Sequence, residues 1–276
     1  MRSKMMQIII AIVLIVVVLY FLAIMPRMLH RPDYKILAGY QYAHRGLHDN
    51  ATEAPENSMA AFRKAVEAGY GIELDVQLTK DRIPVVFHDE SLERVCGVKG
   101  NVRDYTYEEL QEFTLCQSEE KIPLFADFLK LVDGKVPLII EIKIHENYQI
   151  VCEKADELIR AYQGNYCIES FHPLAVYWYR KNRPQVIRGQ LSSRLSEPGK
   201  PESFLYKMVH YLLFNCVGKP DFIAYEHLHE KNISRRICRY FYKALSVAWT
   251  IKSQEQLDNN QDKFDLFIFE GFIPRQ

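Results

Sequence analysis

Short apolar segments alternate with helical segments along most of this chain, and that alternation constrains its fold more than any other feature. Segments rich in Val, Ile, Leu and Phe predict nine strands, at 40–44, 71–78, 83–89, 136–144, 166–170, 186–191, 221–226, 245–251 and 265–270. Helical patterns lie between most of them, at 58–68, 148–162, 174–181, 204–216 and 233–244. Such alternation is typical of parallel strands joined by crossover helices.

The connection between the second and third predicted strands is too short for a crossover helix, which requires a dozen or more residues. It therefore predicts an antiparallel hairpin in which Thr79 pairs with Arg82, so that Glu73 lies opposite His88 and Asp75 lies opposite Val86. Setting that arm aside leaves eight βα units, so we predict an α/β fold, a TIM (β/α)8 barrel over residues 40–276. An open doubly wound sheet is the alternative, but no GxGxxG turn supports it.

The segment from about residue 90 to residue 121 interrupts the alternation of strands and helices, which predicts a small insertion in the barrel. Thr106 and Glu109 within it have the spacing of a capping box, which predicts the start of a short helix. This segment is too short to be read as a separate domain, so we expect it to extend the barrel's loop region.

The run from Met6 to Met25 carries no charge and has the length that a helix needs to cross a hydrocarbon core. We predict a transmembrane helix over 6–25, with a tail at 1–5 before it and a linker at 26–39 after it. A cleaved secretory signal is the alternative, but its apolar region is usually shorter and is followed by small residues.

Basic residues flank this run on both sides, so they do not indicate which side of the membrane the barrel occupies. The chain has six cysteines, none of them in a CxxC pair, which argues against a zinc site. Scattered cysteines suit a reducing compartment better than three disulfides, and so favour a cytoplasmic catalytic domain.

Four charged residues lie inside predicted strands that are otherwise apolar, namely Glu73, Asp75, Glu141 and Lys143. Side chains two apart on a strand share a face, so each pair projects together. Buried charges cost several kcal/mol each unless they are paired or bind a metal. Three carboxylates with one lysine predict a site for one divalent cation, Ca²⁺ or Mg²⁺. The alternative is an ion pair between the lysine and one acid.

Two histidines, His44 and His88, each end a predicted strand at the mouth where a barrel keeps its active site. Two histidines facing carboxylates suit a general acid and a general base near neutral pH. Arg45 and Lys143 are suited to hold a phosphate, Arg45 by bidentate hydrogen bonds and Lys143 as a point charge. These residues predict metal-assisted cleavage of a phosphodiester. No Ser or Cys lies in a nucleophile-elbow context, which disfavours an acyl hydrolase.

Several motifs resemble the glycerophosphodiester phosphodiesterase family, and the resemblance runs from about Tyr42 to the end. They are AHRG, PENS, ELDVQLTKDRIPVVFHD and LIIEIK, with SF at 170–171 and WT at 249–250. The resemblance implies a TIM barrel of the phospholipase C-like phosphodiesterase type, with a small insertion after the second histidine. It also implies hydrolysis of glycerophosphodiesters to glycerol 3-phosphate and an alcohol, with one divalent cation.

The resemblance assigns roles to individual residues. It makes His44 and His88 the acid–base pair, Glu73, Asp75 and Glu141 the metal ligands, Arg45 and Lys143 the phosphate-binding residues, and Glu56 and Asn57 supporting residues. Trp249 is expected either to pack against the glycerol end of the substrate or to be a core residue of its strand. In the mechanism that the resemblance implies, the glycerol 2-hydroxyl acts as internal nucleophile. Glu270-Gly271 stands where family members usually carry Thr-Asp, which affects the alcohol-side pocket more than the catalytic core.

Alternative functions remain open at the level of sequence. The same barrel could cleave lysophospholipids, in the manner of a lysophospholipase D, or could be a catalytically inactive, membrane-tethered binding module. Aromatic residues are frequent in 204–214 and 235–245, which core packing explains in most barrels and which would also suit contact with lipid headgroups. With 35 Lys+Arg and 35 Asp+Glu, the chain has no basic excess for general nucleic-acid binding.

Overall fold

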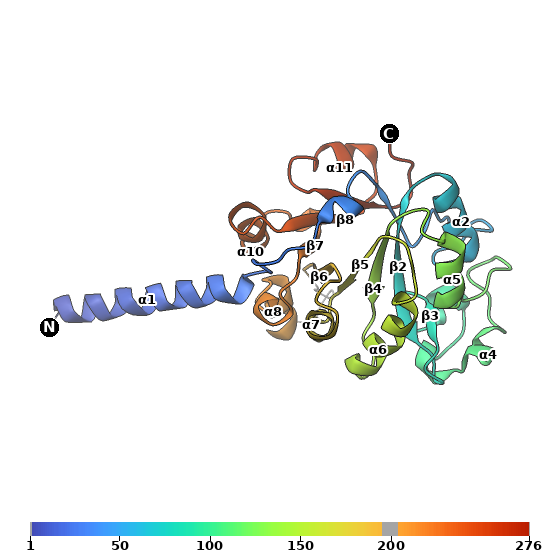
Figure 1. Ribbon diagram of the computed structural model, residues 1–276, viewed down its shortest axis with the longest axis horizontal. Coiled ribbons are helices and arrows are strands. Elements are labelled where there is room, and N and C mark those ends of the chain that lie inside the picture. Colours follow the sequence, from blue (N-terminus) through green and yellow to red (C-terminus); the bar gives the residue numbers. More distant parts are fainter. Residues whose placement is uncertain (1, 195–203, 276) are drawn as a thin grey trace.

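The computed structural model describes residues 2–194 and 204–275, and its centre is a closed barrel of parallel strands (Figure 1). Each barrel strand pairs with the next, and β1 pairs with both β2 and β9, which closes the ring. The strands are β1 (Tyr42–His44), β2 (Gly71–Leu78), β4 (Leu138–Ile142), β5 (Tyr166–Ser170), β6 (Arg188–Ser192), β7 (Phe222–Glu226), β8 (Leu245–Ile251) and β9 (Leu266–Phe269). The predicted TIM barrel is confirmed.

The third predicted strand, which lies outside the ring of eight, is β3 (Pro84–Val86). It pairs antiparallel with β2, so the predicted hairpin is also confirmed. Its predicted register is wrong by one residue, because Val76 rather than Asp75 faces Val86. The reason is a three-residue loop. The Thr79 N–H donates to the Ile83 carbonyl at 3.1 Å, and Arg82 adopts a left-handed φ of 61°. His88 consequently lies beyond the end of β3 and does not pair with Glu73.

Helices cover the outside of the barrel in most crossovers (Figure 1). They are α2 (Met59–Glu67), α5 (Phe125–Val132), α6 (Tyr148–Ile159), α7 (Pro173–Asn182), α8 (Phe204–His210), α9 (Asn215–Gly218), α10 (Ile233–Arg236) and α11 (Gln254–Asp258). The helix predicted over 204–216 is two helices, since Leu212 has a φ of 58° that an α-helix cannot contain. The helix predicted over 233–244 is also shorter, because a π-helical turn over Ile237–Phe241 follows α10.

The insertion after β3 contains α3 (Glu93–Cys96), a 3₁₀ turn at Val102–Asp104 and α4 (Tyr107–Leu110). The predicted capping box opens α4, since the Thr106 N–H donates to Glu109 Oε2 at 2.7 Å and the Glu109 N–H donates to Thr106 Oγ1 at 3.3 Å. Apolar side chains of the insertion form a small core with Val85 and Phe87, so the segment is packed against the hairpin.

Large side chains fill the barrel interior near the amino-terminal ends of the strands. They fit there because two inward-facing positions are glycine. A Cβ on Gly71 would lie 2.7 Å from the ring of Tyr42, and one on Gly189 would lie 2.2 Å from the ring of Phe222. The predicted linker contributes a 3₁₀ turn, η1 (Tyr34–Leu37), and the Tyr42 hydroxyl donates to the Leu37 carbonyl at 2.8 Å. The linker therefore packs against the interior at the amino-terminal ends of the strands.

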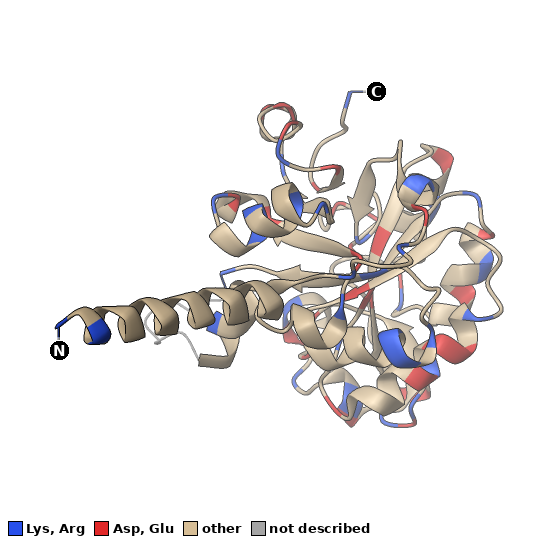
Figure 2. Cartoon of the chain, turned by 60° about the vertical axis from the view of Figure 1, so that its left-hand side comes forward, with Lys and Arg blue, Asp and Glu red and all other residues tan. Residues whose placement is uncertain are grey.

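The amino-terminal helix α1 (Arg2–Ile24) projects away from the barrel, and only Ile24 is buried (Figure 1). It begins earlier than the apolar run and carries its charges at its start (Figure 2). Length and composition make it long and apolar enough to cross a membrane. Its last turn is held by the barrel, because the Asn215 side chain donates to the Ile24 carbonyl at 2.9 Å and the Tyr20 hydroxyl lies 2.7 Å from the Ser234 hydroxyl.

Candidate active site

Three buried carboxylates meet inside the barrel at the carboxyl ends of β2 and β4. One oxygen each from Glu73, Asp75 and Glu141 lies within 4.8 Å of the others. Lys143 follows β4, and its Nζ lies 2.8 Å from Glu141 Oε2 and 3.0 Å from Asp75 Oδ1. The structure thus brings together the four charged residues that the strand pattern singled out, and Lys143 pairs with two of the acids rather than one.

The three carboxylates of this cluster differ in how readily they ionise. Burial opposes ionisation of Asp75, but Lys143 and neighbouring cations hold its pKa well below the usual value. Burial, together with the charges of Asp75, Glu169 and Glu141, raises the pKa of Glu73 well above its usual value. Burial also raises the pKa of Glu141, although Lys143 offsets part of this effect. Three convergent carboxylates are the oxygen donors that Ca²⁺ and Mg²⁺ prefer, so these residues fit such an ion.

A fourth carboxylate, Glu169, was not among the site residues predicted from the sequence. It lies on β5 beside Glu141, is buried, and its Oε2 has no hydrogen-bond partner among the described residues. Burial first, and then the charge of Glu141, raises its pKa well above the usual value. The sequence did contain an indication of it. Like the other acids, Glu169 is a charged residue within a predicted strand, and it lies two residues from Cys167, which shares its inward face.

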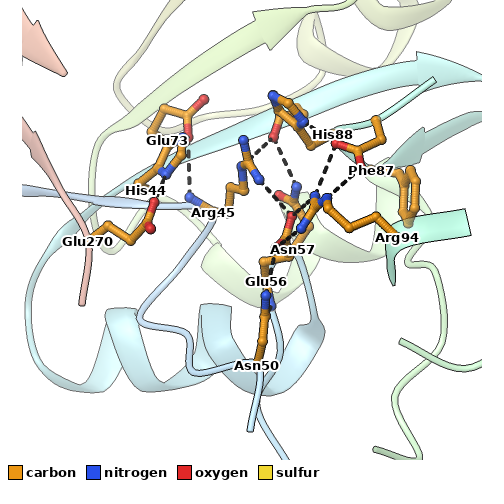
Figure 3. A network of polar contacts seen from close by, with 12 residues as sticks. His44, Arg45, Asn50, Glu56, Asn57, Glu73, Phe87, His88, Arg94 and Glu270 are labelled. Atoms are coloured by element: carbon orange, nitrogen blue, oxygen red, sulfur yellow. Dashed lines mark hydrogen bonds and ion pairs between the residues drawn. The ribbon is translucent and has the colours of Figure 1, made fainter. Parts of the chain in front are cut away.

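The AHRG and PENS motifs pack together beneath this cluster (Figure 3). Arg45 has a left-handed φ of 55°, and its Nη1 donates to Glu56 Oε1 at 2.7 Å. The Asn57 side chain donates to Asp75 Oδ2 at 2.9 Å. Gly46 allows this approach, because its φ is 84° and a Cβ there would lie 3.0 Å from Ala61. Arg45, Glu56 and Asn57 are therefore fixed relative to the carboxylates.

Arg94, from α3 in the insertion, is a second site residue that the sequence did not reveal (Figure 3). It donates to both oxygens of Glu56, at 2.8 and 2.7 Å, and its Nε donates to Asp89 Oδ2 at 2.6 Å. Burial opposes ionisation of Glu56, but hydrogen bonds from Arg94 and the charge of Arg45 lower its pKa to about 2. A bidentate contact of this kind ties the insertion to the barrel mouth.

Each predicted catalytic histidine contacts a carboxylate through Nδ1. His44 Nδ1 lies 2.5 Å from Glu270 Oε2, while its Nε2 lies 3.8 Å from Glu73 Oε2. Burial lowers the pKa of His44 to about 4, so the ring is neutral at pH 7 and Nδ1–H donates to Glu270. His88 Nδ1 lies 2.6 Å from Asp89 Oδ1. Both rings therefore keep Nε2 available for proton transfer.

Two further features belong to the surroundings of the predicted site residues. Trp249, in β8, contacts Phe171 edge-to-face with ring centroids 5.7 Å apart. A cavity of about 490 Å³ is lined by residues 46–50 and 269–273, which include Glu270, the partner of His44. The atypical Glu270-Gly271 pair is thus part of the wall of a cavity next to a predicted catalytic histidine.

Comparison with known proteins identifies the family of this chain. Residues 44–256 match the model of the glycerophosphoryl diester phosphodiesterase family. The chain belongs to this family. The fold of this chain agrees with that of solved structures. A phosphodiesterase from Oleispira antarctica, in complex with sn-glycerol-3-phosphate, superposes with a TM-score of 0.68 at 21% identity. The superposition covers 86% of this chain and 94% of that one. A glycerophosphodiester phosphodiesterase from Thermotoga maritima gives a TM-score of 0.61 at 26% identity, over 83% and 94% of the two chains.

Two curated members of the family match over about half of this chain at 35% identity or more. A glycerophosphodiester phosphodiesterase from Bacillus altitudinis is 40% identical over 157 residues, which is 52% of this chain and 63% of that protein. Human lysophospholipase D GDPD1 is 35% identical over 150 residues, which is 50% of this chain and 46% of that protein. The matches therefore span less than two thirds of the length of either relative.

Proposed function

We propose that this protein is a metal-dependent glycerophosphodiester phosphodiesterase, which hydrolyses glycerophosphodiesters to glycerol 3-phosphate and an alcohol. The observation that carries the proposal is the buried Glu73, Asp75 and Glu141 cluster, faced by the Nε2 atom of His44 and bordered by Lys143. Membership of the family supports the reaction class. The name of the Bacillus altitudinis relative supports the substrate class.

Glu73, Asp75 and Glu141 would hold one divalent cation, Ca²⁺ or Mg²⁺. When bound, such an ion offsets the charge of the carboxylates and polarises an oxygen of the phosphodiester. Arg45 and Lys143 bind and orient the phosphate from opposite sides of Asp75, with Nε of Arg45 3.5 Å and Nζ of Lys143 3.0 Å from its oxygens. Glu56 keeps the Arg45 guanidinium in place, and Asn57 keeps Asp75 in place.

The two histidines divide the proton transfers. Neutral His44 accepts a proton at Nε2 from the attacking hydroxyl, which is the glycerol 2-hydroxyl or water, and Glu270 stabilises the imidazolium that forms. His88 donates a proton from Nε2 to the leaving alcohol, while Asp89 holds its Nδ1. Trp249 and Phe171 pack against the glycerol end of the substrate.

The helix α1 serves as a single-pass membrane anchor in this proposal. Its apolar length supports anchoring, and its tight attachment through Asn215 and Ser234 argues for a barrel held close to the bilayer. All six cysteines are free, which supports a cytoplasmic position for the barrel, as the sequence suggested.

Two other functions were open from the sequence. Cleavage of lysophospholipids keeps support, because a human relative is named for that activity and an apolar groove borders Lys143. The inactive binding module loses support. A barrel without chemistry has no physical reason to keep three buried carboxylates, and the neutral His44 that faces them, in one place.

The test uses the full chain in detergent micelles with glycerophosphocholine, following products by phosphorus NMR. We expect release of glycerol 3-phosphate with Ca²⁺ or Mg²⁺, none with EDTA, and a loss of at least about 100-fold in Glu73→Gln. The matched control is Glu67→Gln, which changes an exposed acid on α2. Activity that persists in EDTA, or in Glu73→Gln, would contradict the proposal.

A further inference from the structure

The cavity lined by residues 46–50 and 269–273 contains metal-ligating side chains that the proposed reaction uses only in part. His48 and Glu270 belong to its lining. One donor atom each from His44, His48 and Glu270 lies within 4.8 Å of the other two. These three residues are all different from those of the three-carboxylate cluster, so they form a second group of possible metal ligands.

His48 is the member of this group whose polar atoms have no other use. Both of its ring nitrogens are buried, and neither has a hydrogen-bond partner among the described residues. A buried polar atom without a partner is uncommon in proteins and indicates a bound water or ion. Burial also lowers the pKa of His48, so its ring is neutral at pH 7, which is the form that binds a metal.

Glu270 supplies the negative charge of the group. Its hydrogen bond with His44 holds the pKa of Glu270 well below the usual value, so the carboxylate is ionised. Its Oε1 lies 3.3 Å from Nζ of Lys252, whose side chain is 63% exposed. An incoming cation therefore meets an ionised carboxylate, and the exposed Lys252 ammonium is free to turn into the solvent.

The donor atoms of this group select a different metal from the carboxylate cluster. Two imidazoles and one carboxylate are the ligands of many zinc sites, whereas Ca²⁺ and Mg²⁺ prefer oxygen alone. Zinc–ligand bonds of about 2.0 to 2.2 Å place tetrahedral donors about 3.4 Å apart, so shifts of about 1 Å close the group around an ion. The cavity leaves room for water as the fourth ligand. Cysteine spacing does not bear on this site, because none of its donors is a thiolate.

His44 lies between the two groups, and Figure 3 shows it between Glu73 and Glu270. Its Nε2 lies 3.8 Å from Glu73 Oε2, and its Nδ1 lies 2.5 Å from Glu270 Oε2. An ion held at Nδ1 would therefore act directly on the ring that serves the proposed reaction.

We infer that His44, His48 and Glu270 bind a transition-metal ion of the Zn²⁺ class, and that an ion bound there inhibits the enzyme. The inference rests on the proposed phosphodiesterase function, in which His44 carries its proton on Nδ1 and accepts another at Nε2. A metal bound to Nδ1 occupies the lone pair of that nitrogen, so the ring proton moves to Nε2. The ring stays neutral, but Nε2 has no lone pair left to accept a proton from the attacking hydroxyl.

Calorimetric titration tests the site without reference to activity. Zn²⁺ is added to the full chain in detergent micelles at saturating Mg²⁺, which fills the carboxylate cluster. We expect wild type to bind one equivalent of Zn²⁺ more than His48→Gln. His48→Phe, which keeps a ring but has no ring nitrogen, should lose the same equivalent. The control is His30→Gln, which changes an exposed histidine of the linker and should bind Zn²⁺ as wild type does.

The kinetic test follows glycerol 3-phosphate release from glycerophosphocholine at saturating Ca²⁺ or Mg²⁺. Saturating Zn²⁺ should lower kcat/KM of wild type at least about 100-fold, which is what the loss of a general base costs. Half-inhibition of His48→Gln should require at least about 100-fold more Zn²⁺, because one ligand is missing. Without Zn²⁺, this variant should turn over as wild type does. Raising the Ca²⁺ or Mg²⁺ concentration further should not relieve the inhibition, because the two ions occupy different sites.

The outcomes separate the metal site from the phosphodiesterase function. Equal Zn²⁺ stoichiometry in wild type and both His48 variants would overturn the site. Zn²⁺ binding without inhibition, or inhibition that excess Mg²⁺ relieves, would overturn the inhibitory role. If glycerophosphocholine is not cleaved under any condition, the phosphodiesterase function fails, and the calorimetric comparison still decides the metal site by itself.

Discussion

His44 Nδ1 lies 2.5 Å from Glu270 Oε2, a contact that joins the end of β1 to the end of β9 where the barrel closes. The two residues are 226 positions apart in the sequence. The sequence resemblance marked Glu270 as an atypical residue, and the structure shows that its carboxylate is the partner of a proposed catalytic histidine. The carboxylate fixes the tautomer in which Nε2 accepts a proton.

Replacing Glu270 tests this contact. In Glu270→Gln the side chain still accepts the Nδ1 hydrogen bond but no longer carries the charge that stabilises the imidazolium. We expect kcat/KM for glycerophosphocholine to fall about 10- to 100-fold, with the cation affinity unchanged. Glu255→Gln, an exposed acid on α11, should behave as wild type. Wild-type kinetics in Glu270→Gln would show that the contact is only structural.

Cation binding should release protons, because the pKa of Glu73, a proposed ligand, is raised without the ion, and the charge of the ion favours ionisation of Glu73 and of the neighbouring Glu169. The measurement is calorimetric titration with Ca²⁺ at pH 6 in two buffers of different ionisation enthalpy. We expect proton release from wild type and a smaller release from Glu169→Gln. Equal release from the two proteins would exclude Glu169 from the electrostatic environment of the ion.

Stability at acid pH should depend on Glu56. Its pKa is about 2 in the folded protein against an ordinary value of 4.5, so its contribution is complete above pH 4.5 and is lost as the pH falls towards 2. This lowering of the Glu56 pKa corresponds to about 3 kcal/mol of unfolding free energy at pH 7. Urea unfolding at pH 7 and pH 3 should show a smaller pH-dependent loss in Glu56→Gln than in wild type. Glu67→Gln should lose stability as wild type does.

Lys143 should stabilise the protein most when no cation is present. Lys143→Met leaves Asp75 and Glu141 buried without their partner, which we expect to cost about 3 to 5 kcal/mol of unfolding free energy in EDTA. Saturating Ca²⁺ should recover part of that loss, because the ion supplies the missing positive charge. Thermal melts with and without Ca²⁺ measure the difference. Lys130→Met, on the exposed side of α5, should change neither melt. A loss of the same size in both conditions would refute the coupling.

Local patterns predicted the fold because they act over a few residues. The alternation of apolar strands and helices, and the short connection after Thr79, were enough to expect eight parallel strands and one hairpin arm. The register of the hairpin was not predictable in this way. It depends on whether Arg82 adopts a left-handed conformation, and the sequence alone did not distinguish a two-residue from a three-residue loop.

The sequence by itself determined which side chains point into the barrel, since the two-residue period of a strand places Glu73 with Asp75 and Glu141 with Lys143 on the inner face. Only the tertiary structure decided which partners those residues meet. Barrel closure brings Glu270 to His44, and the packing of the insertion brings Arg94 to Glu56. Contacts between distant segments depend on how strands and loops assemble in three dimensions, and no local period encodes that assembly.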